Sequence, residues 1–263
     1  MNVNPPPGAI PISWFVSRAD DWERVDGAII EEKNVCIQVN GQVLARFMAT
    51  PMELEALALG FLRSEGIITK PTDVADLHIG ASGGCVDVWL ARSTALPDGA
   101  DAIRTAGCGG GVTFDDLEGY KPAPFPDIHL TPAQLIARYY EMRATEVLYP
   151  ITRGVHASAL CTPDEVLIIA EDVGRHNTLD KLWGKAMLSG ASTAGRIVVT
   201  TGRISSEMLG KAAKMGVPVI ASRTSPTSRS VALARQWGIT LVAYIRRGGF
   251  RVYAGEERLM AED

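Results

Sequence analysis

One cysteine of the chain has a setting suited to nucleophilic chemistry. Cys108 stands among four glycines in the stretch Arg104-Thr105-Ala106-Gly107-Cys108-Gly109-Gly110-Gly111-Val112. Because glycine loses more backbone entropy on ordering than any other residue, this composition predicts a bending loop that presents its sulfur rather than burying it. A thiol attacks only when it is ionised, and a loop folded back on Arg104 would favour the thiolate. The alternative interpretation is that Cys108 is a small residue in a flexible linker.

A second set of candidate residues consists of arginines that follow the strands expected in the second half of the chain. The strands are expected over 165–170, 196–201, 217–222 and 240–245, and the arginines are Arg175, Arg203, Arg223 and the pair Arg246 and Arg247. In open α/β sheets, ligands bind in the crevice outside the carboxyl ends of the strands. Helix N-termini and arginine forks in that position match phosphate oxygens. The repetition predicts a pocket for a phosphate-bearing, nucleotide-like ligand, whereas separate surface arginines are the alternative.

The densest polar motif of the chain lies between these strands, at Glu171-Asp172-Val173-Gly174-Arg175-His176-Asn177. Asp172 and His176 are of types that could orient a ligand's base or ribose, or move a proton near the thiol. A structural interpretation is also open. In that case Asn177 caps a helix, Asp172 pairs with Arg175, and His176 is a satisfied core side chain.

Composition bounds the class of protein. A chain of 263 residues is long enough for one large α/β domain or two modest ones, and nearly half of its residues are hydrophobic. It has no apolar run of about 18 residues and no secretion signal, so we expect a cytoplasmic protein without membrane contact. A net charge of -4 argues against nucleic acid as a general partner.

The four cysteines, Cys36, Cys85, Cys108 and Cys161, are scattered along the chain. None lies within metal-pair spacing of another, and all except Cys108 fall in expected strands. We therefore expect neither a disulfide framework nor a zinc knuckle.

The first half of the chain predicts a small α+β domain over residues 1–119, with the Cys108 loop at its end. A mobile polyproline-like arm is expected at Pro5-Pro6-Pro7. Asn40-Gly41 joins two alternating apolar runs, which is the strongest short signal of a β-hairpin. A helix is expected to follow, with Thr50 as its cap, Pro51 at its first position and Gly66 at its end.

The second half, residues 120–263, begins with a proline-stiffened linker and predicts a helix capped by Thr131, then two strands joined by a turn, then alternating helices and strands. This order indicates a mixed sheet, mainly parallel in its later part, sandwiched by helices, and it matches the cytidine deaminase-like fold. Zinc deaminase chemistry requires His-x-Glu and Pro-Cys-x-x-Cys. Here His156-Ala157-Ser158 lacks the acid, and the candidate helix starts contain no cysteine. The fold is expected, but the zinc chemistry is not.

The sequence resembles the FdhD/NarQ family, the accessory sulfurtransferases of formate dehydrogenase. The similarity covers most of the chain after Glu31, and the run Asp172-Val173-Gly174-Arg175-His176-Asn177 is its most specific part. The other matching segments are 39–41, 55–62, 65–68, the Cys108 loop, 154–160, 171–181, 203–207, 221–228 and 248–253.

This resemblance implies a cytoplasmic sulfurtransferase, and it implies a homodimer. The protein would take sulfur from a cysteine desulfurase as a persulfide on Cys108 and pass it to the bis-molybdopterin guanine dinucleotide cofactor for the catalytic subunit of formate dehydrogenase. The family's cofactor-binding segment corresponds to Tyr244-Ile245-Arg246-Arg247-Gly248-Gly249, where GDP or a GMP-like nucleotide would also fit.

The chain departs from the family pattern at one position. The family commonly has Cys-x-x-Cys in the loop, whereas Cys108-Gly109-Gly110-Gly111 keeps only the first sulfur. If the first cysteine suffices, sulfur transfer is retained. If both are needed, the chain would act as a non-catalytic chaperone that binds and protects the cofactor.

Overall fold

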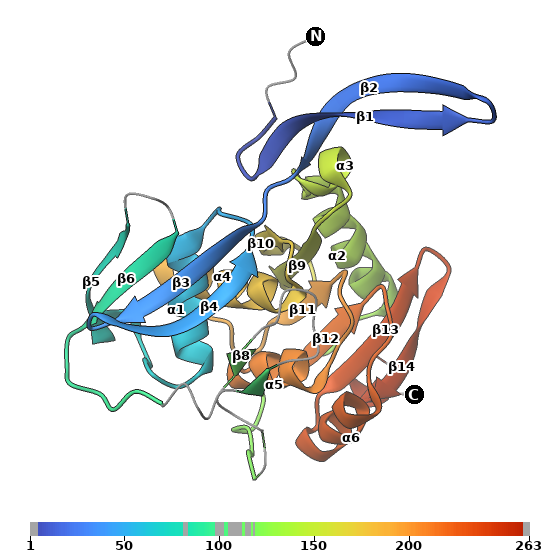
Figure 1. Ribbon diagram of the computed structural model, residues 1–263. Helices are drawn as coiled ribbons and strands as arrows, with labels where there is room; N and C mark the ends of the chain where they lie inside the picture. Colours follow the sequence, from blue (N-terminus) through green and yellow to red (C-terminus); the bar gives the residue numbers. More distant parts are fainter. Residues whose placement is uncertain are drawn as a thin grey trace.

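The computed structural model describes residues 5–80, 84–97, 103–104, 112–113, 117 and 119–259 (Figure 1). They form a four-stranded sheet, a six-stranded sheet and two separate strand pairs. Cys108, the predicted nucleophile, lies outside the described residues.

A two-stranded hairpin, which the sequence did not lead us to expect, begins the described chain. β1 (Ala9–Arg18) and β2 (Asp21–Ile30) pair antiparallel along their whole length and project from the body of the molecule (Figure 1). The base of the hairpin packs on α3 (Tyr149–Thr152) through a small apolar cluster. Farther out, apolar side chains stay exposed, and Phe15 and Trp22 have exposed fractions of 65% and 66%.

The first sheet has the strand order β4-β3-β6-β5. Its strands are β3 (Lys33–Val39), β4 (Gln42–Ala49), β5 (Val74–Ile79) and β6 (Cys85–Leu90), with the 3-10 turn η1 (Pro71–Asp73) before β5. The apolar side chains of β3 and β6 pack against α1 (Leu54–Ser64). Asn40 and Gly41 have φ values of 50° and 82°, which confirms the predicted turn between β3 and β4.

The predicted start of α1 at Thr50 and Pro51 is wrong. The helix begins at Leu54, after Glu53 in the left-handed region with φ 53°. The polar groups of Thr50 are used elsewhere, because its hydroxyl accepts from the amide of Val173 and its own amide donates to Asp172. A contact with a distant part of the chain therefore takes the residue that local sequence assigned to a helix cap.

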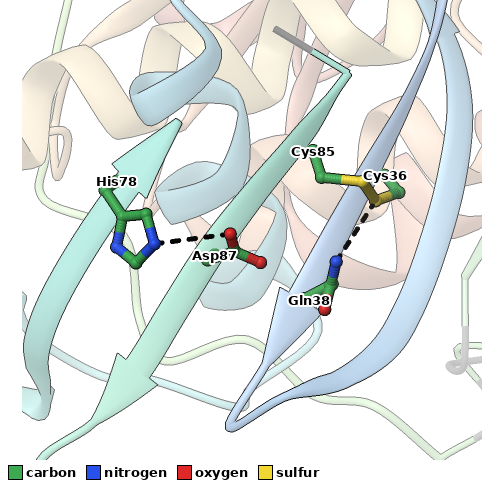
Figure 2. Close-up of a disulfide and its surroundings, with 5 residues drawn as sticks. All are labelled: Cys36, Gln38, His78, Cys85 and Asp87. Carbon is green, nitrogen blue, oxygen red and sulfur yellow. Dashed lines mark hydrogen bonds and ion pairs between the residues drawn. A yellow bond between two sulfur atoms is a disulfide. The ribbon is translucent and has the colours of Figure 1, made fainter. Parts of the chain in front are cut away.

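The expectation that the cysteines form no disulfide is also wrong. Cys36 on β3 and Cys85 on β6 are joined by a disulfide across 49 residues of sequence (Figure 2). The two strands are parallel neighbours, and Cys36 is the register partner of Cys85. Sequence spacing does not reveal which strands pair or in which register, so this contact could not be read from the cysteine positions.

The second sheet has the order β10-β9-β11-β12-β13-β14 and is mixed, as predicted. β11, β12 and β13 are parallel, and the other neighbouring pairs are antiparallel. The strands are β9 (His156–Cys161), β10 (Val166–Asp172), β11 (Ile197–Thr200), β12 (Val219–Ser222), β13 (Thr240–Arg246) and β14 (Gly249–Ala254).

Helices cover both faces of this sheet, which confirms the expected sandwich. α2 (Pro132–Thr145), capped by Thr131 as predicted, packs on one face. The other face is covered by α4 (Arg175–Ser189), α5 (Ser206–Lys214) and α6 (Ser228–Trp237), and the 3-10 turn η3 (Glu256–Arg258) follows the last strand. Within the described ranges, no helix combines the length and hydrophobicity that crossing a bilayer requires.

The two sheets are joined by a close helix pair, α1 against α4. Glycines on both helices permit the approach. A Cβ atom added at Gly60 would overlap the backbone of Asp180, and one added at Gly184 would overlap the backbone of Ala56. The first sheet is therefore held against α4, the helix that follows β10 at one edge of the second sheet.

Candidate functional site

A cavity of about 690 Å³ lies at the edge of the second sheet where β11 and β12 end. Thr201 and Arg223, which follow these two strands, line it. The antiparallel strand β9 begins at the same edge, so His156 also lines the cavity, and Val173 enters it from the end of β10. The ligand pocket predicted outside the carboxyl ends of the strands thus has a counterpart in the fold.

Three arginines and three tyrosines give the cavity its chemistry. The arginines are Arg143 of α2, Arg153 after α3 and Arg223 after β12, and the tyrosines are Tyr139, Tyr140 and Tyr149. The guanidinium groups of Arg143 and Arg153 lie 4.1 Å and 5.2 Å from the ring centroid of Tyr149. Such a lining offers forked donors for phosphate oxygens and flat rings for a planar ligand group.

The carboxylate of Glu171 fixes the segment that carries Tyr149. It accepts hydrogen bonds from the amides of Val147, Leu148 and Tyr149 at 2.8 to 3.2 Å. These amides belong to the start of the short helix α3 and have no helical acceptor of their own. A negative charge at this point stabilises the turn and so positions Tyr149 and, one turn later, Arg153.

A second carboxyl lies behind the cavity wall. Oε1 of Glu146 is 2.8 Å from Nη1 of Arg143, and the Glu146 side chain is almost completely buried. Burial raises the pKa of Glu146 to about 7, although the charge of Arg143 opposes this rise. Its Oε2 atom has no hydrogen-bond partner in the described part of the chain.

The imidazole of His156 lies at the cavity wall beside a threonine hydroxyl. Its Nδ1 lies 3.3 Å from the hydroxyl of Thr201. Burial lowers the pKa of His156, and electrostatic interactions with Arg175, His176 and Arg203 lower it further, against an opposing effect of Asp172. A neutral ring suits hydrogen bonding to a ligand and leaves the positive charge of the site to the arginines.

Of the residues predicted to bind a ligand, Arg223 lines the cavity and the C-terminal segment borders it. Nη1 of Arg223 donates to the carbonyl of Ile245 at 3.2 Å, and Arg246 donates to the carbonyl of Arg223 at 2.8 Å. The guanidinium of Arg247 lies 5.1 Å from the ring centroid of Tyr140, a cavity residue.

The rest of this segment forms a neighbouring hollow of about 420 Å³ on the same sheet. It is lined by Tyr244, Arg246, Gly248, Gly249, Phe250 and Arg251. Arg251 stacks on Tyr244 at 4.6 Å. The hydrogen bond from Arg246 to the carbonyl of Arg223 links a residue of the smaller hollow to one of the larger cavity.

Asp172 lies beneath this edge rather than in the cavity. It is fully buried and forms a 2.6 Å ion pair with Lys181, not with Arg175. It also accepts hydrogen bonds from the amides of Thr50 and Gly174 and from the side chain of Asn177. Asn177 does not cap α4, whose N-cap is Gly174. The Asp172–Arg175 pair and the Asn177 cap of the structural alternative are therefore wrong, and Asp172 is instead bound by Lys181, Thr50, Gly174 and Asn177.

Three of the predicted ligand-binding residues lie near this edge of the second sheet but do not line the cavity that the described residues form. They are Arg175, His176 and Arg203. His176 is buried, with Nε2 3.3 Å from Ser205 Oγ and 3.7 Å from Glu207. Burial lowers the pKa of His176, and the hydrogen bond to Glu207 opposes this effect. Arg203 is exposed, whereas Arg175 is buried against Gly202.

Two short strands are described on either side of the Cys108 stretch. β7 (Ile103–Arg104) and β8 (Val112–Thr113) pair antiparallel, with Arg104 opposite Val112. The backbone ends of the glycine-rich stretch therefore lie side by side. β8 contacts β4, the strand that leads into Thr50 and the Asp172 network.

The residues that sequence reasoning missed are those from α2 and α3. Tyr139 and Arg143 are four residues apart, so on a helix they share one face. That spacing was the available signal. The spacing does not indicate that this face of α2 lies against the ends of strands that come later in the chain.

Comparison with known proteins identifies the group to which this architecture belongs. Residues 30–260 match the model of the FdhD/NarQ family. The chain belongs to that family.

Relatives in the family cover nearly the same length. A protein of Bacillus subtilis (strain 168), named sulfur carrier protein FdhD, is 34% identical over 90% of this chain and 92% of its own. One with the same name from Shouchella clausii (strain KSM-K16) is 35% identical over 90% and 91%. A crystal structure from Desulfotalea psychrophila, described as a formate dehydrogenase accessory protein, has a TM-score of 0.81 and 30% identity and covers 97% of this chain and 100% of its own.

Proposed function

We propose that this member of the FdhD/NarQ family is a sulfur carrier for formate dehydrogenase. It takes sulfur from a cysteine desulfurase as a persulfide on Cys108 and passes it to the bis-molybdopterin guanine dinucleotide cofactor. The observation that carries the proposal is the cavity into which Arg143, Arg153 and Arg223 converge, in a chain whose relatives are named sulfur carriers.

The cavity fits a ligand with phosphates and flat ring systems. Its volume of about 690 Å³ lies in the range of pockets that enclose nucleotide-sized molecules. Arginine forks bind phosphate oxygens in pairs, and the tyrosine rings offer faces for a guanine or a pterin. The neighbouring hollow with Arg246 and Arg251 would hold a second part of a dinucleotide.

The loading of sulfur onto Cys108 is a thiol–persulfide exchange and needs no redox partner. Attack of the Cys108 thiolate on the desulfurase persulfide forms the Cys108–S–S⁻ group and releases the desulfurase thiolate. In the second step the outer sulfur bonds to the cofactor, which is the substrate, while the S–S bond breaks and Cys108 leaves as a thiolate; the two electrons that bring this sulfur to the sulfide level come from the reduced metal centre of that substrate. Positive charge at the cavity favours both the phosphates and the anionic persulfide.

Direct binding of GDP tests the ligand part of this proposal. We expect Arg143→Ala to weaken GDP binding roughly tenfold, because it removes a charge-assisted contact. The matched control is Arg92→Ala, an exposed arginine in the N-terminal half. Calorimetric titration that finds equal GDP affinity in wild type and Arg143→Ala would contradict the proposed site.

The single loop cysteine supports a second candidate, a chaperone that binds the cofactor without transferring sulfur. Only Cys108 stands where the family commonly has two cysteines. Complementation of a strain that lacks its own sulfurtransferase separates the two functions. Full rescue by Cys108→Ala supports the chaperone, and loss of formate dehydrogenase activity supports the sulfur carrier.

We also propose that the protein works in the cytoplasm as a homodimer. Support for a second copy comes from the β1–β2 hairpin, whose apolar residues Ile10, Ile12, Trp14 and Ile29 are each about 40% exposed. Sedimentation should show a dimer for the wild type and a monomer for Ile12→Lys. If the Ile12→Lys variant forms a dimer of unchanged stability, the hairpin is not part of the contact between subunits.

A further inference from the structure

We propose that the Cys36–Cys85 disulfide is a second sulfur site, one that undergoes thiol–disulfide exchange with an external dithiol and is attacked at Cys85. The proposal is independent of Cys108 and of the sulfur-carrier function. It concerns the outer face of the first sheet, opposite the face that packs on α1 (Figure 2).

The two cysteine residues differ in burial. Cys36 on the inner strand β3 has an exposed fraction of 0%. Cys85, the first residue of β6, is partly exposed. Exchange requires an attacking thiolate to reach one sulfur in line with the S–S bond. Since Cys85 is the less buried residue of the pair, we expect attack at Cys85 with Cys36 as the leaving group.

The strand pairing keeps the two cysteines together without the covalent bond. Their Cα atoms are 4.4 Å apart, and the parallel register continues past them through Ile37 with Val86 and Val39 with Val88. These four partners are buried in the apolar core of the N-terminal half. Reduction would therefore leave two apposed thiols on an intact sheet, so the bond can form again without refolding.

Polar groups surround the leaving sulfur. The side chain amide of Gln38 donates to Cys36 Sγ at 4.0 Å (Figure 2). Arg46 on β4 is the register partner of Cys36, and on the other side Asp87 lies 3.4 Å from His78. The Gln38 donor favours the thiolate that exchange produces at Cys36.

The reaction balances with a dithiol as the only co-reactant. One thiolate of the dithiol bonds to Cys85 Sγ, and the Cys36–Cys85 bond breaks to leave Cys36 as a thiolate. The second thiolate of the dithiol then displaces Cys85. The protein gains two electrons and two protons as two thiols, and the dithiol becomes a disulfide.

Cys161 provides a contrast within the same protein. It is the free cysteine of the described residues and is completely buried in β9. Burial raises the pKa of the Cys161 thiol to about 12. It therefore stays unreactive while the fold is intact and reports any unfolding.

The test uses the full chain carrying Cys108→Ala, so that Cys36, Cys85 and Cys161 are the only cysteines. The native protein is treated with dithiothreitol, alkylated with iodoacetamide and analysed by peptide mass. We expect complete loss of the cross-linked peptide, alkylation of Cys36 and Cys85, and none of Cys161. In an unalkylated sample, replacing dithiothreitol by glutathione disulfide should restore the bond.

The site of attack is tested with glutathione. In the same background, glutathione disulfide should convert the free Cys85 thiol of Cys36→Ser to a mixed disulfide with release of glutathione, and it should form none at Cys36 of Cys85→Ser. If a variant does not fold, the Cys108→Ala protein with its disulfide intact is treated with reduced glutathione and quenched with acid. The cysteine that carries the first mixed disulfide then identifies the site of attack. The proposal is overturned if the bond resists dithiothreitol until denaturant is added, if reduction exposes Cys161, or if glutathione is found on Cys36.

Discussion

Arg143 and Glu146 form an ion pair of 2.8 Å in which the arginine lines the cavity and the carboxyl is buried behind it. The positive charge that faces a ligand therefore depends on the protonation state of a group the ligand does not touch. Because burial raises the pKa of Glu146 to about 7, this dependence falls in the range where cells operate.

The first prediction follows from that pair. Below about pH 7 Glu146 is neutral, so the charge of Arg143 is uncompensated and anions bind more tightly. We take the effect of one neighbouring charge on the free energy of GDP binding as about 1 kcal/mol. The ratio of wild-type to Glu146→Gln affinity for GDP should therefore rise roughly fivefold from pH 8 to pH 6. Glu146→Gln is uncharged at position 146 at every pH. Its pH profile therefore measures the effect of the protonation of GDP itself. Parallel pH profiles of the two proteins would contradict the prediction.

Stability should change with pH in the same direction as GDP affinity. The folded-state pKa of Glu146 lies above its ordinary value of 4.5, so its contribution is fully present below about pH 4.5 and is lost as pH rises through about 7. Urea unfolding at several pH values should therefore show a flatter profile for Glu146→Gln than for the wild type.

The second prediction concerns Arg223, a cavity residue whose guanidinium donates to the carbonyl of Ile245. Arg223→Lys keeps the charge but loses the fork, so GDP affinity should fall roughly tenfold. Arg235→Lys is the matched control, because Arg235 is exposed on α6 and also donates to a backbone carbonyl, that of Tyr253. Equal losses in both variants would show that the effect does not come from the cavity.

The third prediction tests the joint between the two sheets. Gly184→Ala places a methyl group against the backbone of Ala56, which cannot move without separating α1 from α4. The free energy of unfolding should fall by about 3 kcal/mol in chemical denaturation. Gly80→Ala, where the added atom meets only an ordinary contact, should stay close to the wild type. A Gly184→Ala protein as stable as the control would mean that the helices tolerate a wider spacing.

The second sheet was predictable because its strands are short buried apolar runs between polar turns. Residues 196–201 and 217–222 were expected as strands and appear as β11 and β12 with ends shifted by one or two residues. The position of the cavity followed from the same strands, since Arg223 and Thr201 come directly after them. These inferences use local pattern and one general rule of sheet topology.

What could not be predicted depends on contacts between distant segments. Thr50 has the local signature of a helix cap, but its polar groups bind the Asp172 motif 122 residues away. Arg143 and Arg153 reach the cavity because α2 and α3 dock at the sheet edge. The Cys36–Cys85 bond depends on the register of two parallel strands, which no spacing of cysteines encodes.

The central claim is that sulfur travels on Cys108, and peptide mass after sulfur loading tests it most directly. The full chain is incubated with a cysteine desulfurase and cysteine, then alkylated and digested. The account predicts that the Cys108 peptide gains the mass of one sulfur atom, that Cys161→Ser retains this gain and that Cys108→Ala loses it. A Cys108 peptide of unchanged mass under conditions in which the desulfurase turns over would contradict the account.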